Sequence, residues 1–275
     1  MTRRVALLGK PLRRRHSVVM HNAAFAAAGI DAVYELRELE ADEVPDAVAE
    51  ARGEGWLGLG VTAPYKKLVA TLLDEVEPDA AKIGAVNNVV RMPDGRLIGF
   101  NTDAPGFRVA VEAAMGRSLT GANVVVAGAG GVAQAVAYAC IKAGVARLTV
   151  GNRSLPASAA GVAAVDLAST DFEQALRSAD LAVNATTVGM LDPGMSFDPA
   201  LLPQGATVFD CVYVPFETPL LAAARARGLN AANGAEMLIA QAAIAFERWT
   251  GIGGMADVMR EAVAPLFADP AAASA

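Results

Sequence analysis

Cysteine and histidine are scarce in this chain of 275 residues, which holds only two of each. Cys140 and Cys211 are too few for a disulfide framework or a cysteine metal site, and both stand in apolar runs where a buried thiol is expected. His16 and His21 have no carboxylate help at a recognisable metal-ligand spacing, so we expect no metal. This cysteine usage predicts a reducing, cytoplasmic compartment.

Long apolar runs and an excess of basic charge are also lacking. The first apolar run, Val5 to Leu8, is too short for the core of a signal peptide. The stretch from Val124 to Ile141 is broken by glycines and by Gln134, which favours strand, turn and helix over a membrane span. The net charge of -6 argues against a general affinity for nucleic acid or for an anionic membrane. We therefore expect neither as a partner.

Hydrophobic residues make up 54% of the chain, enough for a sizeable core in one large domain or two ordinary ones. Strand-like runs alternate with helix-like runs, and this order predicts an α/β protein with parallel sheets covered by helices. From Asn123 onward each strand run is nearly continuous in apolar residues, as in a doubly wound sheet buried on both faces. The predicted strand runs are residues 4–9, 32–39, 56–62, 123–130, 147–152, 181–186 and 207–213.

The segment "NVVVAGAGGVAQAVAYAC" combines a buried strand, a glycine turn and an alanine-rich helix. Gly128, Gly130 and Ala133 have the G-x-G-x-x-A spacing, in which the first glycine allows a tight turn and the second lets backbone approach a pyrophosphate. The helix N-terminus then offers free N–H groups to the anion. We interpret this turn, with Gly131, as a dinucleotide site; the alternative is a tight turn without a ligand.

The next predicted strand ends at "GNRS", about where an acidic residue normally accepts the 2′-hydroxyl of NAD. Asn152 and Arg153 stand there instead. A guanidinium can neutralise and hydrogen-bond a 2′-phosphate, which a carboxylate would repel. The sequence therefore favours NADP over NAD, with NAD left open, and an ordinary solvated role for Arg153 is the alternative.

Further polar segments follow a consistent order along the chain. They are "GKPL…HSVVMHN", "VTAPYKK", "GAVNNVV", "GFNTDAPGF", "GAGGVAQA", "GNRS", "NATTVGM", "VYVPFETPL" and "GAEMLIAQAAIAFERWTG". In these segments the chain resembles shikimate dehydrogenase and its close relatives, nearly from end to end. The resemblance implies an N-terminal α/β substrate domain, residues 1–104 with 236–275, and a Rossmann-type doubly wound NADP domain, residues 105–235.

The resemblance also implies an activity, the NADP-linked interconversion of shikimate and 3-dehydroshikimate, a step of aromatic amino acid biosynthesis in which a CH–OH group is oxidised to a ketone or the ketone is reduced to CH–OH. Lys66, in the family motif V-T-x-P-x-K, and Asp103 would be catalytic, because an ammonium held protonated by a carboxylate can donate a proton to a ketone oxygen. The substrate-binding residues that the resemblance implies are Ser17, Thr62, Asn87, Gln241 and Tyr213, and the cofactor contacts include Gly234 and Met237.

The chain departs from the family pattern on the substrate side. Arg15 stands where the family has the first of two serines that bind the substrate carboxylate, and Gly60 replaces an asparagine. Either Arg15 contacts the acid directly, or the loop is shifted and residues 13–15 are solvated or pair with the acidic stretch 35–43. We further expect His21, with Asn22, to open the first helix.

Two alternatives to a shikimate dehydrogenase stay open from the sequence. One is a relative that prefers quinate, aminoshikimate or another cyclic hydroxy acid, for which the substrate-side departures argue. The other is a nucleotide-sensing regulator without turnover, against which the presence of both Lys66 and Asp103 argues. The oligomeric state is not predicted, with a homodimer as one option.

Overall fold

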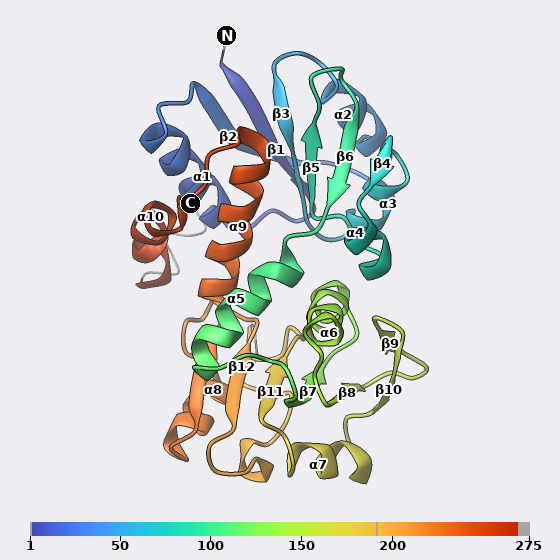
Figure 1. Cartoon of the computed structure of the whole chain (residues 1–275), viewed down its shortest axis with the longest axis vertical. Helices are drawn as coiled ribbons and strands as arrows, with labels where there is room; N and C mark the ends of the chain where they lie inside the picture. The colour runs from blue at the N-terminus through green and yellow to red at the C-terminus, as the bar shows by residue number, and fades with distance from the viewer. Residues whose placement is uncertain (1, 191, 269–275) are drawn as a thin grey trace. The chain divides into compact units, whose positions relative to one another are not determined.

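The computed structural model describes residues 2–190 and 192–268 and divides the chain into two compact units (Figure 1). The first unit runs to Thr102 and resumes at Gln241, so that it is built from both ends of the chain. The second unit spans Asp103–Ala240. The chain therefore crosses from one unit to the other twice, once in each direction.

The first unit contains a mixed sheet, in which the described strands follow the order β2-β1-β3-β5-β6-β4. Strands β1, β2 and β3 are parallel, as predicted, but β5 runs antiparallel to β3 and to β6. The prediction of a parallel sheet is wrong for this hairpin, whose two strands have only four residues each. The strands are β1 (Arg3–Gly9), β2 (Ala32–Glu38), β3 (Trp56–Val61), β4 (Glu75–Val76), β5 (Asn88–Arg91) and β6 (Leu97–Phe100).

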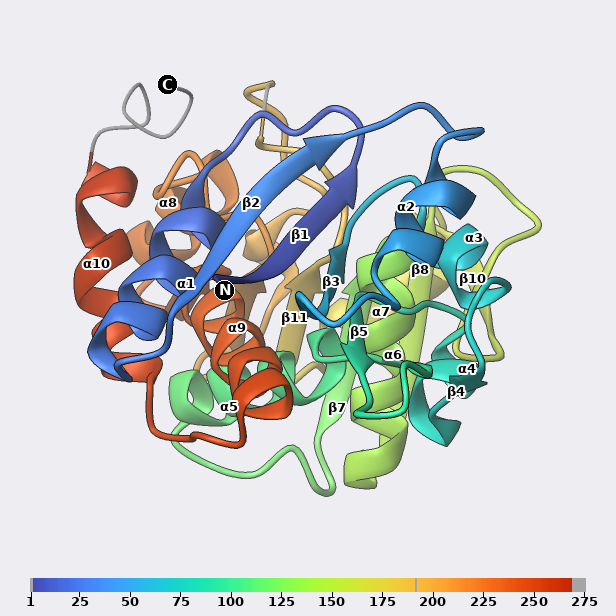
Figure 2. The ribbon, with the colours of Figure 1, turned by 90° about the horizontal axis from the view of Figure 1, so that it is seen from above.

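Helices cover both faces of this sheet (Figures 1 and 2). One face carries Ala6, Leu59 and Val61 and is buried against helices α2 and α3. On the other face α1 packs on β2 and on α10, and Trp249 of α9 donates its Nε1–H to the carbonyl of Val89 at 2.9 Å. The helices of this unit are α1 (His16–Ala27), α2 (Val44–Glu50), α3 (Lys66–Ala70), α4 (Pro78–Ile83) and α10 (Ala256–Ala268), with α9 (Ala235–Thr250) from Gln241 onward.

Helix α1 begins at His16, five residues before the predicted start at His21. The carbonyl of Arg15 accepts the N–H of Val19 at 3.0 Å, which closes the first turn. His21 instead lies buried in the middle of the helix and stacks on Tyr34 with ring centroids 4.4 Å apart. The prediction of a helix start at His21 is therefore wrong, because an aromatic contact accounts for this histidine rather than a cap.

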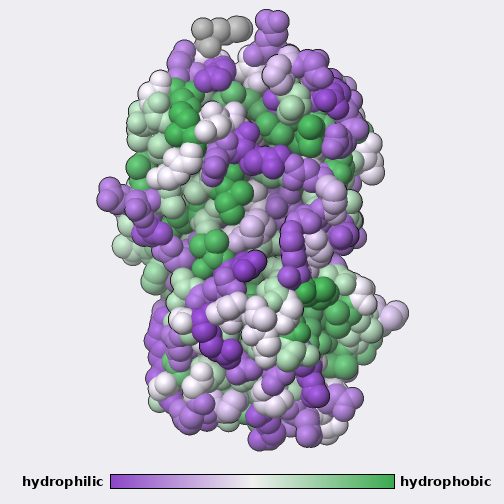
Figure 3. Space-filling model, in the orientation of Figure 1, coloured by the Kyte–Doolittle hydropathy of each residue, from purple (hydrophilic) through white to green (hydrophobic). Residues whose placement is uncertain are grey.

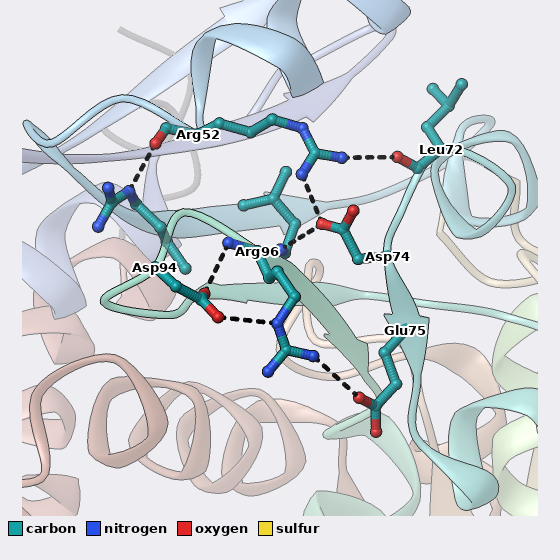
Figure 4. Close-up of polar contacts among 8 residues, drawn as sticks. Arg52, Leu72, Asp74, Glu75, Asp94 and Arg96 are labelled. Carbon is teal, nitrogen blue, oxygen red and sulfur yellow. Dashed lines mark hydrogen bonds and ion pairs between the residues drawn. The ribbon is translucent and has the colours of Figure 1, made fainter.

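Charged side chains fasten the turn between β5 and β6 to its neighbours (Figure 4). Asp74 accepts the backbone N–H of Leu97 at 2.8 Å and pairs with Arg52, and Arg96 pairs with Asp94 at 2.9 Å. The hydrogen bond from Arg52 is the largest of the effects that lower the pKa of Asp74. The two ion pairs are exposed, so they fix the local geometry more than they add stability.

The second unit holds a parallel sheet with the described order β13-β12-β11-β7-β8-β10-β9, where only the terminal pair β10 and β9 is antiparallel. From β10 to β13 this is the doubly wound order 3-2-1-4-5-6 of dinucleotide-binding sheets, as predicted. The strands are β7 (Asn123–Ala127), β8 (Arg147–Asn152), β9 (Ser158–Ala159), β10 (Val162–Asp166), β11 (Leu181–Asn184), β12 (Thr207–Asp210) and β13 (Asn230–Asn233).

Helices again lie on both faces of this second sheet (Figure 1). Phe107 of α5 meets Phe209 of β12 edge-on on one face, where α6 also packs. On the other face Phe172 of α7 and Leu221 of α8 pack against Val125 and Val208. The helical segments are α5 (Asp103–Met115), α6 (Gly131–Ala143), α7 (Thr170–Leu176), the short 3-10 helix η1 (Pro199–Leu201) and α8 (Pro219–Ala226).

Polar and apolar side chains are mixed over the face of the molecule shown in Figure 3. Among the described helices, none combines the length and the apolar character that crossing a bilayer requires.

Candidate functional site

The loops that carry Thr62 and Asn87, two of the predicted substrate residues, meet at one edge of the first sheet. Strands β1 and β3 end there because they are parallel, and β5 begins there because it is antiparallel to β3. Three backbone hydrogen bonds join these loops: Thr62 N–H to Leu8 O at 2.9 Å, Val61 N–H to Asn87 O at 2.8 Å, and Val86 N–H to Lys66 O at 3.1 Å. Backbone hydrogen bonds therefore hold these loops in fixed positions relative to one another.

Buried amides and a threonine form a hydrogen-bonded cluster at this edge. The hydroxyl oxygen of Thr102 accepts from Nδ2 of Asn87 at 3.1 Å and from Nδ2 of Asn88 at 2.9 Å, and lies 3.1 Å from Oε1 of Gln241, to which it donates. Oδ1 of Asn87 accepts the backbone N–H of Thr102 at 2.8 Å. Two of the predicted substrate residues, Asn87 and Gln241, are thus joined through Thr102, and Asn88 belongs to the same cluster.

Lys66 and Thr62 lie beside this cluster on the segment after β3. Lys66 is the first residue of α3 and is half-buried, while Lys67 is exposed. A Cβ added at Gly9 would come within 2.4 Å of Cγ2 of Thr62, so the loop after β1 passes close to this threonine. The side chain that the motif selects, Lys66, is therefore also the less exposed of the two lysines.

Ser17 and Arg15 lie on the loop and helix that follow β1. Ser17 is the second residue of α1 and is half-buried, and Arg15 is exposed immediately before the helix. The acidic stretch predicted as a partner of the arginines is contacted by other groups of this loop: Lys10 pairs with Glu40, and the N–H of Leu12 donates to Glu38 at 2.6 Å.

The glycine turn of the second unit has the geometry that the spacing predicts. Gly128 follows β7 with φ +116°, and a Cβ there would lie 2.8 Å from the carbonyl oxygen of Ala185. At Gly130 and Gly131 no atom lies within 4 Å of an added Cβ, so the turn is open on that side. Ala133 is fully buried on α6. The turn therefore presents bare backbone at the N-terminus of α6.

Asn152 and Arg153 end the neighbouring strand at the same carboxyl edge of the sheet. Asn152 is the last residue of β8 and donates from Nδ2 to the carbonyl of Ser154 at 2.7 Å, and Arg153 is exposed. Gln134 of α6 bonds the carbonyl of Ser158 at 2.7 Å and the N–H of Ala160 at 2.7 Å. The loop that contains Arg153 is thus held against the helix of the glycine turn.

A buried polar network shapes two further loops at this edge. Asp210 accepts from Asn184 at 2.9 Å, from the hydroxyl of Thr218 at 2.7 Å and from the N–H of Val212 at 3.0 Å. Burial raises the pKa of Asp210, an effect that these hydrogen bonds oppose. In the sequence, this network is indicated by the polar residues that end two apolar strand runs, Asn184 in "LAVN" and Asp210 in "TVFD". We had not predicted this network.

Tyr213, Gly234 and Met237 lie beside these loops. Tyr213 is half-buried on the loop after β12, and Met237 is buried on α9. A Cβ at Gly234 would lie 2.3 Å from the carbonyl oxygen of Cys211, so the close approach of the two backbones requires glycine.

Asp103, the residue directly after Thr102, is buried as the first residue of α5. Within the described residues no group of three or more metal-ligating side chains is found.

Two family models match the chain. The shikimate dehydrogenase substrate binding domain matches residues 7–89, and the shikimate 5'-dehydrogenase C-terminal domain matches residues 234–264. The shikimate dehydrogenase (NADP(+)) of Symbiobacterium thermophilum is 43% identical over 276 residues, which cover 94% of this chain and 92% of the relative.

Solved structures of similar proteins match nearly the whole chain. Shikimate 5-dehydrogenase from Thermus thermophilus, in complex with NADP(H) and shikimate, has a TM-score of 0.85 at 38% identity and covers 96% of this chain and 99% of its own. Quinate dehydrogenase from Corynebacterium glutamicum, in complex with NAD, has a TM-score of 0.87 at 35% identity, with 96% and 99% covered.

Proposed function

The chain belongs to the shikimate dehydrogenase family, and on that premise we propose that Lys66 and Asp103 are the catalytic pair of an NADP-dependent shikimate dehydrogenase. It is an oxidoreductase that acts on a CH–OH group with NADP as cofactor. The observation that carries the residue assignment is the polar edge of the first sheet, where Lys66 is bonded through its carbonyl to the segment that presents Asn87.

The substrate is bound, in this proposal, by the side chains at that edge. Asn87 and Gln241 share Thr102 as a hydrogen-bond partner, so their amides are held in fixed orientations from which they can bond ring hydroxyls. Thr62 adds a further hydroxyl from the end of β3. Ser17 and Tyr213 bind the carboxylate, as the family pattern implies.

Proton transfer is assigned to Lys66. In reduction of the ketone, Nζ of Lys66 donates a proton to the carbonyl oxygen; in oxidation of the alcohol, the same nitrogen accepts it. In this proposal the carboxylate of Asp103 orients the lysine side chain. The cofactor, when bound, accepts or supplies the hydride.

The glycine turn fits a dinucleotide. Gly128 has no room for a side chain, and Gly130 and Gly131 leave backbone N–H groups exposed at the start of α6, where a diphosphate is stabilised. Arg153, exposed at the end of β8, would bind the 2′-phosphate that distinguishes NADP from NAD.

Replacement of Lys66 tests the catalytic assignment. We expect Lys66→Ala to lower kcat for shikimate oxidation by ~10²-fold or more, while the affinity for NADP+ stays nearly the same. Turnover is followed at the absorbance band of reduced nicotinamide, and NADP+ binding by calorimetry. Lys67→Ala is the matched control and should keep kcat. Near-native turnover of Lys66→Ala would remove this lysine from the chemistry.

Quinate is the second candidate substrate, because Arg15 replaces a serine on the substrate side and a quinate dehydrogenase is among the similar structures. A panel of shikimate, quinate and aminated analogues with NADP+ and NAD+ separates the candidates. In the same panel, unchanged Michaelis constants of Arg15→Ser for every acid would exclude direct contact by Arg15.

We also propose that the protein is located in the cytoplasm and that it can form a homodimer.

A further inference from the structure

A single backbone N–H sets the orientation of the Asn87 amide. The N–H of Thr102 can only donate, and it lies 2.8 Å from the side chain of Asn87, so the atom that faces it must be the acceptor Oδ1. The other end of the amide, Nδ2, then donates to Oγ1 of Thr102 at 3.1 Å. The two residues are joined twice, so the oxygen and the nitrogen of Asn87 cannot exchange places.

Asn88 uses its amide nitrogen within the same cluster. Its Nδ2 lies 3.0 Å from Oδ1 of Asn87 and 2.9 Å from Oγ1 of Thr102. Because Oδ1 of Asn87 only accepts, the atom of Asn88 that faces it must carry hydrogen. The two hydrogens of this nitrogen serve the two acceptors. Asn88 is only 4% exposed, so its nitrogen acts on its neighbours in the cluster.

The proton of Thr102 therefore has one place to go. Nδ2 of Asn87 and Nδ2 of Asn88 both donate to Oγ1 of Thr102 and fill its two acceptor positions. The hydroxyl proton is left for the third neighbour, the side chain of Gln241 at 3.1 Å, whose facing atom must then be the acceptor Oε1. The donor end of Gln241, Nε2, is the end of the amide directed away from Thr102.

The sheet register places Asn88 opposite Gly60. The two residues are direct partners in the antiparallel pairing of β3 and β5, and such partners project from the same face of a sheet. Gly60 stands where the family pattern has an asparagine, and a Cβ there would lie 2.6 Å from the hydroxyl oxygen of Tyr34. This chain therefore carries the amide at this point of the sheet on β5 rather than on β3.

We propose that Asn88 is a positioning residue, which commits the proton of Thr102 to Gln241 so that Asn87 and Gln241 both meet the substrate hydroxyls through N–H groups. Without Asn88, one acceptor position of Oγ1 of Thr102 opens, and the space left admits water that can accept the Thr102 proton. Gln241 can then turn its amide and present Oε1 to the substrate instead. The inference rests on the proposed function, in which Asn87 and Gln241 bind the substrate.

Kinetics of Asn88→Ala test this assignment. We expect KM for shikimate to rise about 5- to 10-fold, with kcat within about 2-fold and KM for NADP+ unchanged, because the amides bind the substrate and the transition state alike. In a Thr102→Val background, which lacks the hydroxyl through which Asn88 acts, the same change should add less than about 2-fold. Asn123→Ala removes an amide in the other unit and is the control; it should keep KM for shikimate.

A wild-type KM in Asn88→Ala, or equal increases in the wild-type and Thr102→Val backgrounds, would overturn the inference. An absence of turnover on shikimate in the wild type would instead overturn the proposed function, so the two failures are distinguishable.

Neutron diffraction from crystals of the wild-type protein in D2O gives a second test, which depends neither on turnover nor on the folding of a variant. We expect the deuteron on Oγ1 of Thr102 to point at Oε1 of Gln241, and the two deuterons on Nδ2 of Asn88 to point at Asn87 and Thr102. A Thr102 deuteron directed at either asparagine would contradict the proposed pattern of donors and acceptors.

Discussion

Replacing Gly130 with alanine should separate cofactor binding from stability. Gly130 has φ -77° and ψ -172°, which any L-residue adopts, and no heavy atom lies within 4 Å of a Cβ built there. The free energy of unfolding should therefore change by less than about 1 kcal/mol. The added methyl group projects instead from the backbone at the start of α6, where the diphosphate is expected.

The affinity for NADP+ should fall by much more. Loss of one charge-assisted hydrogen bond between the turn and the diphosphate, about 1.5–3 kcal/mol, corresponds to an increase in Kd of about 10- to 150-fold. Calorimetric titration with NADP+ measures this change, and thermal unfolding without cofactor measures the stability of the same sample.

Gly144→Ala is the matched control at the other end of α6. Gly144 has φ +74° and open space around it, so alanine there should destabilise the protein by roughly 1–2 kcal/mol with no effect on NADP+ affinity. If Gly130→Ala bound NADP+ as tightly as the wild type, the diphosphate would not lie against this turn, and the interpretation of the glycine spacing would be refuted.

Two further predictions concern protonation and cofactor choice. Burial lowers the pKa of His21 to about 3, against roughly 6.5 in the unfolded chain. Between these values the unfolded state binds more protons, so the free energy of unfolding decreases as the pH is lowered, by up to about 1.4 kcal/mol per pH unit. Urea unfolding between pH 7.5 and 5.5 should show this slope, and the same slope in His21→Phe would assign it to other groups. Arg153→Ala should raise KM for NADP+ by about 10-fold and leave KM for NAD+ unchanged, and equal effects on both cofactors would rule out a 2′-phosphate contact.

The second sheet was predictable because its signals are local. A parallel strand buried on both faces is a continuous apolar run, and the conformation at Gly128 is one that glycine favours, so both are visible in a single segment. The hairpin of β5 and β6 was missed because each strand is short and its pairing with β3 joins residues about 30 positions apart.

The site was only partly predictable for the same reason. The family pattern selected Asn87 and Gln241, but the hydroxyl of Thr102 that connects them depends on where α9 returns to the sheet.

The first unit is assembled from both chain ends, and this has a consequence for synthesis on the ribosome. Gly58 needs Trp249 to cover its face of the sheet, and α1 needs α10, so residues 1–102 cannot complete their core until the last helices have been translated. The second unit, Asp103–Ala240, is continuous and can fold as soon as it emerges. The nascent protein should therefore complete the second unit first, while the segment made earlier still exposes apolar surface to chaperones.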